Sequence, residues 1–129
     1  MNTMTLTPTA RGFTLKQLLG FDALTCLAFG LALMAAPKPL AELLGVPATL
    51  LFYAGMALLP CAVLMSLASR TLAKPLVWIV VFGNFAWAAA SVAVAFMFDT
   101  TALGMVFVLA QALLVAALGA LEARATRAS

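Results

Sequence analysis

Histidine is absent from this 129-residue sequence, and acidic residues number only four. Charged residues make up 9% of the chain, whereas a soluble domain carries about 25%. Hydrophobic residues reach 66%, against roughly 45–50% in soluble domains. A soluble globular fold is therefore excluded, because its surface would consist largely of apolar side chains. The scarcity of groups that could act as general acids or bases predicts that the protein is not an enzyme.

Cysteine is also scarce, with only Cys26 and Cys61 and no CxxC motif. Both residues lie in apolar segments rather than in an oxidising solvent, so we expect no disulfide framework. Two soft ligands without a third or fourth make a poor metal site, and we predict neither a metal site nor a cofactor. The few basic residues form no cluster with aromatic side chains, so we do not expect nucleic acid as a partner.

What the chain does contain is four long apolar runs, at about residues 18–36, 47–69, 76–98 and 101–121. A helix of roughly 20 apolar residues crosses a hydrocarbon core of ~30 Å. The sequence therefore predicts an all-α membrane protein, a four-transmembrane-helix bundle that forms a single integral membrane domain over residues 1–129. A secretory signal peptide is the alternative for the first run. It is disfavoured because the run is long, Asp22 interrupts it and no clean cleavage site follows.

Basic residues concentrate on one side of this predicted bundle. The N-terminal tail, the loop between the second and third runs, and the C-terminal tail together hold six of the seven: Arg11, Lys16, Arg70, Lys74, Arg124 and Arg127. The opposite side carries Lys38 with Glu42 and Asp99. Cytoplasmic loops of membrane proteins carry the excess of lysine and arginine. We therefore predict that both termini are cytoplasmic and that the protein lies in the inner (plasma) membrane.

Asp22 is the only acidic residue inside any of the four runs. A carboxyl group is expensive to place in hydrocarbon, so its presence there requires a reason. The structural interpretation is a neutral acid that donates to Asn84 or to a backbone carbonyl, or a charged group close to the lipid headgroups. The functional interpretation is a protonatable coupling site or a ligand for a cation.

Other polar residues share helix faces within the runs. Thr25 lies one turn after Asp22, Asn84 and Trp87 lie one turn apart, and Gln111 is near the middle of the fourth run. These side chains must find partners inside the protein, because the hydrocarbon region contains no water. We predict an intramembrane polar cluster that faces the bundle interior and runs from the cytoplasmic side to mid-membrane: Asp22, Thr25, Asn84, Trp87 and Gln111. Whether the cluster joins helices or contacts a ligand stays open.

Alanines at four-residue spacing recur in the last two runs, at Ala86 and Ala90 and at Ala112, Ala116 and Ala120. Small residues at this spacing let helix backbones approach closely. The contact that they serve is either within the bundle or between copies in a homo-oligomer.

A short pattern runs through the second half of the chain: Gly83-Asn84, Trp87, Ala90-Ser91, Gly104 and Gln111-Ala112. Together with an aspartate in the first run, this pattern resembles small four-span bacterial inner-membrane proteins of uncharacterised function. The resemblance implies a bacterial source and four helices, and it carries no activity.

Two functions fit these observations. The first is a non-enzymatic multi-pass inner-membrane protein, either an accessory subunit of a larger membrane complex or a binder of a lipid or hydrophobic small molecule. The alternative is a small proton-coupled transporter or channel protomer that uses Asp22 and would need to oligomerise. Membrane lipids are expected partners in both cases.

Overall fold

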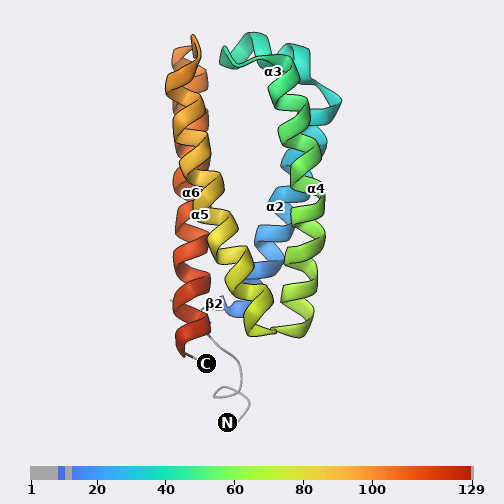
Figure 1. Cartoon of the computed structure of the whole chain (residues 1–129), viewed down its shortest axis with the longest axis vertical. Helices are drawn as coiled ribbons and strands as arrows, with labels where there is room; N and C mark the ends of the chain where they lie inside the picture. The colour runs from blue at the N-terminus through green and yellow to red at the C-terminus, as the bar shows by residue number, and fades with distance from the viewer. Residues whose placement is uncertain (1–8, 11–12, 129) are drawn as a thin grey trace.

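Helices form almost all of the part of the chain that the computed structural model describes, residues 9–10 and 13–128. Four helices are long and apolar enough to cross a membrane: α2 (Leu15–Ala35), α4 (Ala48–Thr71), α5 (Lys74–Met97) and α6 (Ala102–Ala128). The short helix α3 (Pro37–Leu44) lies at one end of the bundle (Figure 1). Two-residue strands β1 (Thr9–Ala10) and β2 (Phe13–Thr14) pair at the other end. The predicted four-helix bundle is confirmed, and the chain is a multi-pass membrane protein.

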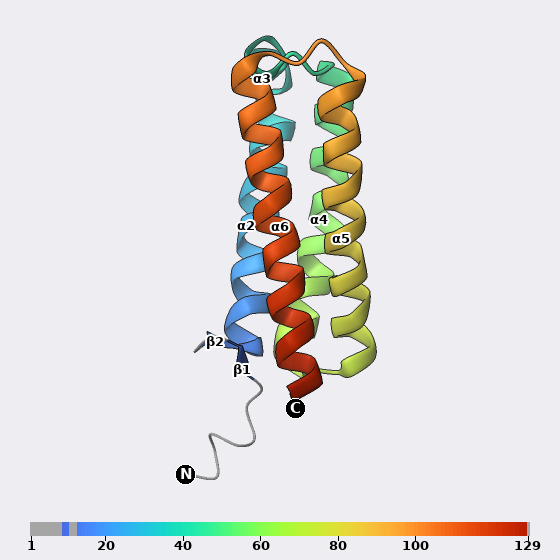
Figure 2. The ribbon, with the colours of Figure 1, turned by 90° about the vertical axis from the view of Figure 1, so that its left-hand side faces the viewer.

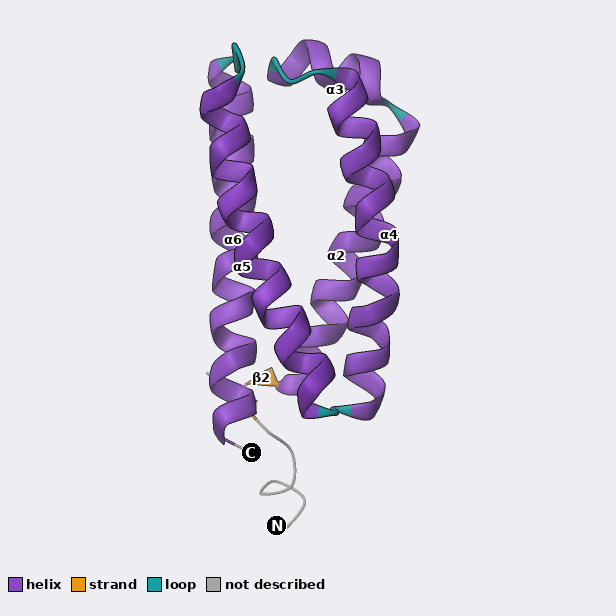
Figure 3. Ribbon diagram, in the orientation of Figure 1, coloured by secondary structure: helices purple, strands orange, loops and turns teal. Residues whose placement is uncertain are grey.

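The bundle consists of two helix hairpins. The α2 helix packs mainly against α4, and α5 packs mainly against α6, whereas contacts between the two hairpins are fewer. Figure 2 shows α2 on the same side as α6, and α4 on the same side as α5. The hairpins lie together at the end where α2 begins and α6 ends, and they diverge toward α3 (Figures 1 and 3).

Within the first hairpin, two glycines bring the backbones of α2 and α4 into close contact. A Cβ atom added at Gly55 would lie 2.7 Å from the carbonyl oxygen of Gly30, and one added at Gly30 would lie 3.0 Å from that of Gly55. Near the start of α2, Ser69 Oγ donates to the Lys16 carbonyl at 3.0 Å, and Lys16 Nζ donates to the Ser69 carbonyl at 3.3 Å. These contacts hold α2 and α4 together as one unit.

The boundaries of two spanning helices differ from the predicted runs. The α2 helix begins at Leu15, where Thr14 and Gln17 form a capping box with two hydrogen bonds of 3.0 Å. The capping box satisfies backbone N–H groups of the first turn and fixes the start of the helix. The α6 helix continues to Ala128, past the predicted end at residue 121, because neither glycine nor proline follows to break it.

The α3 helix, which joins α2 to α4 in the first hairpin, also contacts the start of the second hairpin. The backbone N–H of Thr101, just before α6, donates to the Leu44 carbonyl at 3.0 Å. Gly45 follows α3 with φ +76°, a conformation that glycine adopts without the steric penalty of a side chain. Leu44 is buried, while Leu43 and Glu42 are exposed, so α3 presents an apolar side to the bundle.

The described residues keep the charge asymmetry seen in the sequence. The ends of α2, α4, α5 and α6 opposite α3 carry Lys16, Arg70, Lys74, Arg124 and Arg127. Arg11 lies outside the described residues. The predicted orientation of this end toward the cytoplasm stays a prediction.

Alanines of the two stripes occupy different environments. Ala112 is buried inside the bundle, whereas Ala86 and Ala90 are exposed on the outer surface of the single chain. The contact within the bundle is therefore present at Ala112, and a contact between copies stays a prediction for the α5 stripe.

Candidate functional site

A half-open cavity of about 600 Å³ lies between the two hairpins and is lined by all four spanning helices. A second cavity of about 360 Å³ adjoins it on the side of α3, and Phe29, Trp87, Phe107 and Gln111 line both. The walls are mainly aliphatic and aromatic, with a few polar groups among them. Sites for small molecules commonly have volumes of about 300–1,000 Å³ and this kind of lining.

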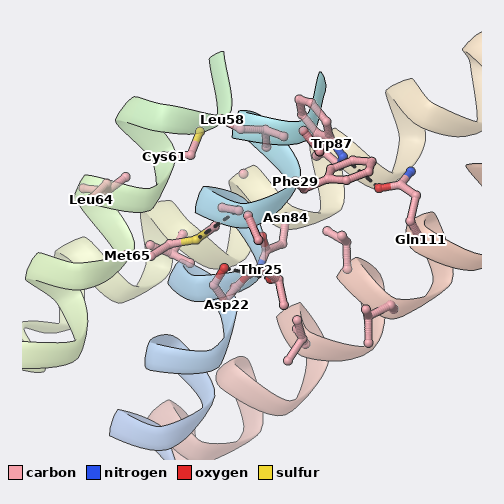
Figure 4. A pocket seen from close by; sticks show the side chains of 18 of the residues that line it. Asp22, Thr25, Phe29, Leu58, Cys61, Leu64, Met65, Asn84, Trp87 and Gln111 are labelled. Carbon is pink, nitrogen blue, oxygen red and sulfur yellow. Dashed lines mark hydrogen bonds between the residues drawn. The ribbon is translucent and has the colours of Figure 1, made fainter. Parts of the chain in front are cut away.

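All five residues of the predicted polar cluster line the larger cavity (Figure 4). The Asp22 side chain is 1% exposed and accepts a hydrogen bond of 2.7 Å from Asn84 Nδ2. Thr25 turns its hydroxyl back to the Asp22 carbonyl at 2.9 Å, so it links no other helix. Gln111 pairs with Trp87 rather than with Asn84. The predicted track is thus divided into two hydrogen-bonded groups, one around Asp22 and one around Trp87.

The first group contains a residue that the sequence analysis missed, Glu122. Its side chain is completely buried, and its Oε1 accepts a hydrogen bond of 3.0 Å from Asn84 Nδ2. The Asn84 amide therefore donates to Asp22 on α2 and to Glu122 on α6. We call these two carboxyl groups and the amide that bridges them the carboxyl group cluster: Asp22, Asn84 and Glu122. Asp22 is the only acidic residue inside the predicted runs, but the structure places the carboxyl group of Glu122, just beyond the fourth run, beside it.

The signal for Glu122 was present in the sequence but not strong. Gln111, Leu118 and Glu122 are spaced by seven and then four positions, so they share one face of a helix. That face becomes relevant only if the helix continues beyond residue 121, where charged residues begin. In the structure, α6 continues past residue 121, and Glu122, which lies outside the predicted run, is therefore buried in the bundle.

The carboxyl groups of Asp22 and Glu122 also hydrogen-bond to each other. No carboxyl group can donate without a proton. Glu122 Oε2 is buried and receives no hydrogen bond from any protein donor in the described residues. Two ionised carboxylates in contact in an apolar site would repel strongly and would lack solvation. The pair therefore holds at least one shared proton, which joins α2 of one hairpin to α6 of the other.

No positive charge compensates this pair within the part of the chain that is described. Neither Asp22 nor Glu122 forms an ion pair with lysine or arginine there, and the titratable groups that face the pair are the thiols of Cys26 and Cys61. With a single shared proton, the two carboxyl groups together keep one negative charge. That charge has only the Asn84 amide as a protein donor.

The second polar group lies further toward α3. Trp87 Nε1 donates to Gln111 Oε1 at 3.1 Å, and Gln111 Nε2 donates to the Val108 carbonyl at 3.1 Å. Figure 4 shows the Trp87 and Gln111 side chains pointing toward one another. Phe29 and Phe107 face each other nearby, with ring centroids 5.6 Å apart. These hydrogen bonds satisfy the side chains of Trp87 on α5 and Gln111 on α6. The aromatic rings form a wall where the two cavities meet.

Sulfur atoms form another part of the cavity lining. Cys26 Sγ donates to Met65 Sδ at 3.5 Å, and Cys61 lines the same cavity as a free thiol. Among residues 9–10 and 13–128, no group of three or more His, Cys, Asp or Glu side chains is placed to hold a metal ion.

Comparison with known proteins gives no relative. No protein-family model matches the chain, and searches of curated proteins and of solved structures find no match.

Proposed function

We propose that this membrane protein is not an enzyme and that it binds a lipid or hydrophobic small molecule in the cavities between its two hairpins. The observation that carries the proposal is the larger cavity, about 600 Å³ with mainly apolar walls and a few polar groups. A membrane protein gains little from leaving such a volume empty, because its lining then loses van der Waals contacts. Acyl chains or a lipophilic compound from the bilayer would restore those contacts.

The arrangement of the hairpins supports this proposal. Contacts between the hairpins are few, and the polar contacts between α2 and the second hairpin lie in the carboxyl group cluster. Toward α3, the helices diverge (Figure 3), and the smaller cavity lies on that side, where Leu44 and Val46 line it. A ligand that fills this space would contact both hairpins and stabilise their relative position.

Gly83 offers a direct test. It lines the larger cavity, and a Cβ atom at this position would meet no heavy atom within 4 Å. We expect Gly83→Leu to fold and to place its side chain in the cavity. Binding of a probe such as octanol to protein in phosphatidylcholine nanodiscs should weaken about tenfold or more, which is a loss of about 1.4 kcal/mol. Empty nanodiscs correct for partition into the lipid.

Gly20→Leu is the matched control. A Cβ atom at Gly20 meets only Ser69 Oγ, at 3.8 Å, and Gly20 does not line the cavity. This variant should bind octanol as the wild-type protein does. Native mass spectrometry of both variants should show a co-purified lipid or small molecule with Gly20→Leu and less of it with Gly83→Leu. Equal binding by the two variants would contradict the proposal.

A second candidate function is a small oligomeric, proton-coupled transporter or channel protomer that uses Asp22. The observation that favours it is the contact between the buried carboxyl groups of Asp22 and Glu122, at the edge of a cavity. Reconstituted protein should then dissipate or use a proton gradient, and Asp22→Asn should abolish the flux while the fold survives. Flux that is lost in Asp22→Asn, with octanol binding preserved, would favour this candidate over the leading proposal.

Both candidates place the termini in the cytoplasm of a bacterial cell, with the protein in the inner membrane. The basic residues at the end of the bundle opposite α3 support this orientation. The accessory-subunit interpretation predicts a partner protein instead of a small ligand. Affinity purification from native membranes, followed by mass spectrometry for proteins and lipids, distinguishes the two.

A further inference from the structure

Asp22 and Asn84 line the larger cavity toward the end of the bundle opposite α3, and they make that part of the lining polar. Glu122 does not line the cavity, but it contacts Asp22 and Asn84, which do. The remaining lining residues include long aliphatic and aromatic side chains such as Leu58, Leu118 and Phe107. A ligand that fits would therefore be an amphiphile, with an apolar body among these side chains and a polar group at Asp22.

The charge of the carboxyl group cluster determines which polar group the amphiphile carries. With one shared proton, the contacting Asp22 and Glu122 carboxyl groups carry one negative charge, and no lysine or arginine of residues 13–128 lies beside them to compensate it. Glu122 Oε2, in a side chain that is completely buried, receives no hydrogen bond from a protein donor. A buried charge is strongly unfavourable unless it is paired. Either a second proton or a cation from the cavity can neutralise that charge.

We propose that the ligand of the cavity is an amphiphilic cation, whose ammonium group lies beside Asp22 and takes the place of a second proton on the Asp22–Glu122 pair. The proposal rests on the proposed function, because it names the class of ligand that the same cavity accepts. An anionic amphiphile would place a second negative charge next to the pair. A neutral amphiphile would fill the cavity but leave the pair to be neutralised by a second proton.

Three probes with the same eight-carbon chain test the charge: octyltrimethylammonium, octanol and octanoate. Each is titrated into wild-type protein in phosphatidylcholine nanodiscs, and the heat with empty nanodiscs is subtracted. The cation should bind about tenfold or more tightly than octanol, since pairing with the buried charge adds to the apolar contacts. Octanoate should bind most weakly of the three.

Two variants localise the effect. The double variant Asp22→Asn with Glu122→Gln keeps side-chain size and hydrogen-bonding groups but removes the charge, so the cation should lose its advantage over octanol. Asp99→Asn removes an exposed carboxyl group in the turn before α6 and should keep the advantage. Retained octanol binding shows that the double variant is folded.

The outcomes separate the two proposals. Equal binding of the cation and octanol by the wild-type protein would overturn the cationic ligand and leave the apolar cavity site intact. A preference for the cation that persists in the double variant would also overturn it, because the charge would then act elsewhere. If none of the three probes binds above the level of empty nanodiscs, the proposed function itself is wrong.

Discussion

The carboxyl group of Asp22 on α2 hydrogen-bonds with that of Glu122 on α6, and Asn84 Nδ2 on α5 donates to both, at 2.7 and 3.0 Å. The α2 helix belongs to one hairpin, whereas α5 and α6 form the other. The carboxyl group cluster is therefore a polar connection between two units that otherwise share few contacts. The strength of this connection depends on all three groups at once.

Replacing Asp22 should separate the effect of hydrogen bonding from that of charge. Asp22→Asn keeps an acceptor for Asn84 and should be tolerated. Asp22→Leu removes one of the two acceptors of Asn84 and the carboxyl partner of Glu122, and it should lower the free energy of unfolding by about 1–3 kcal/mol, as expected when buried polar groups lose a hydrogen bond. Thermal unfolding in detergent measures both. Equal stability of the two variants would contradict the buried contact and indicate that Asp22 faces headgroups or water.

A double-mutant cycle tests the Asp22–Glu122 contact itself. Asp22→Leu combined with Glu122→Leu should destabilise by less than the sum of the single variants, with a coupling of roughly 0.5–3 kcal/mol for residues in contact. The reason is that the second substitution removes a carboxyl group that has already lost its Asp22 partner through the first. The control cycle combines Asp22→Leu with Asp99→Ala, an exposed residue. Additive effects in both cycles would contradict the contact.

Gly55 tests the close approach of α2 and α4. Gly55→Ala places a methyl group 2.7 Å from the Gly30 carbonyl oxygen and 2.9 Å from Leu33 Cβ, so the helices must separate. We expect a destabilisation of about 1–3 kcal/mol, as for other overpacked sites. The matched control is Gly83→Ala, where the added methyl group meets nothing within 4 Å. A result in which the two alanine variants are equally stable would argue against the α2–α4 contact.

Reporter fusions at Ser129 test the orientation of the bundle. Basic residues concentrate at the end where α6 terminates, and such residues favour the cytoplasmic side. A reporter that is active only in the cytoplasm should therefore be active at this position, and a periplasmic reporter should be silent. A fusion after Glu42, in α3 at the opposite end, should give the reverse pattern. Activity of the periplasmic reporter at Ser129 would contradict the predicted topology.

Part of the candidate site followed from the sequence. An aspartate in a hydrocarbon-length run must face a partner, and this requirement predicted the Asp22–Asn84 contact that the structure shows. The same reasoning placed Gln111 in one track with them, whereas the structure pairs it with Trp87. Each buried polar side chain requires a hydrogen-bond partner, but this requirement does not identify the partner. The choice depends on the rotation and height of α5 relative to α6.

By itself, the sequence determined four membrane-length helices, because apolar length and helix-breaking residues are local properties. It also determined that the polar faces turn inward, since hydrocarbon offers no hydrogen bonds. Only the tertiary structure decided that Glu122 joins Asp22, that the helices pair as two hairpins, and that a cavity of about 600 Å³ remains between them. These features depend on how far α6 extends and on the packing of helices distant in sequence, and no local pattern fixes either.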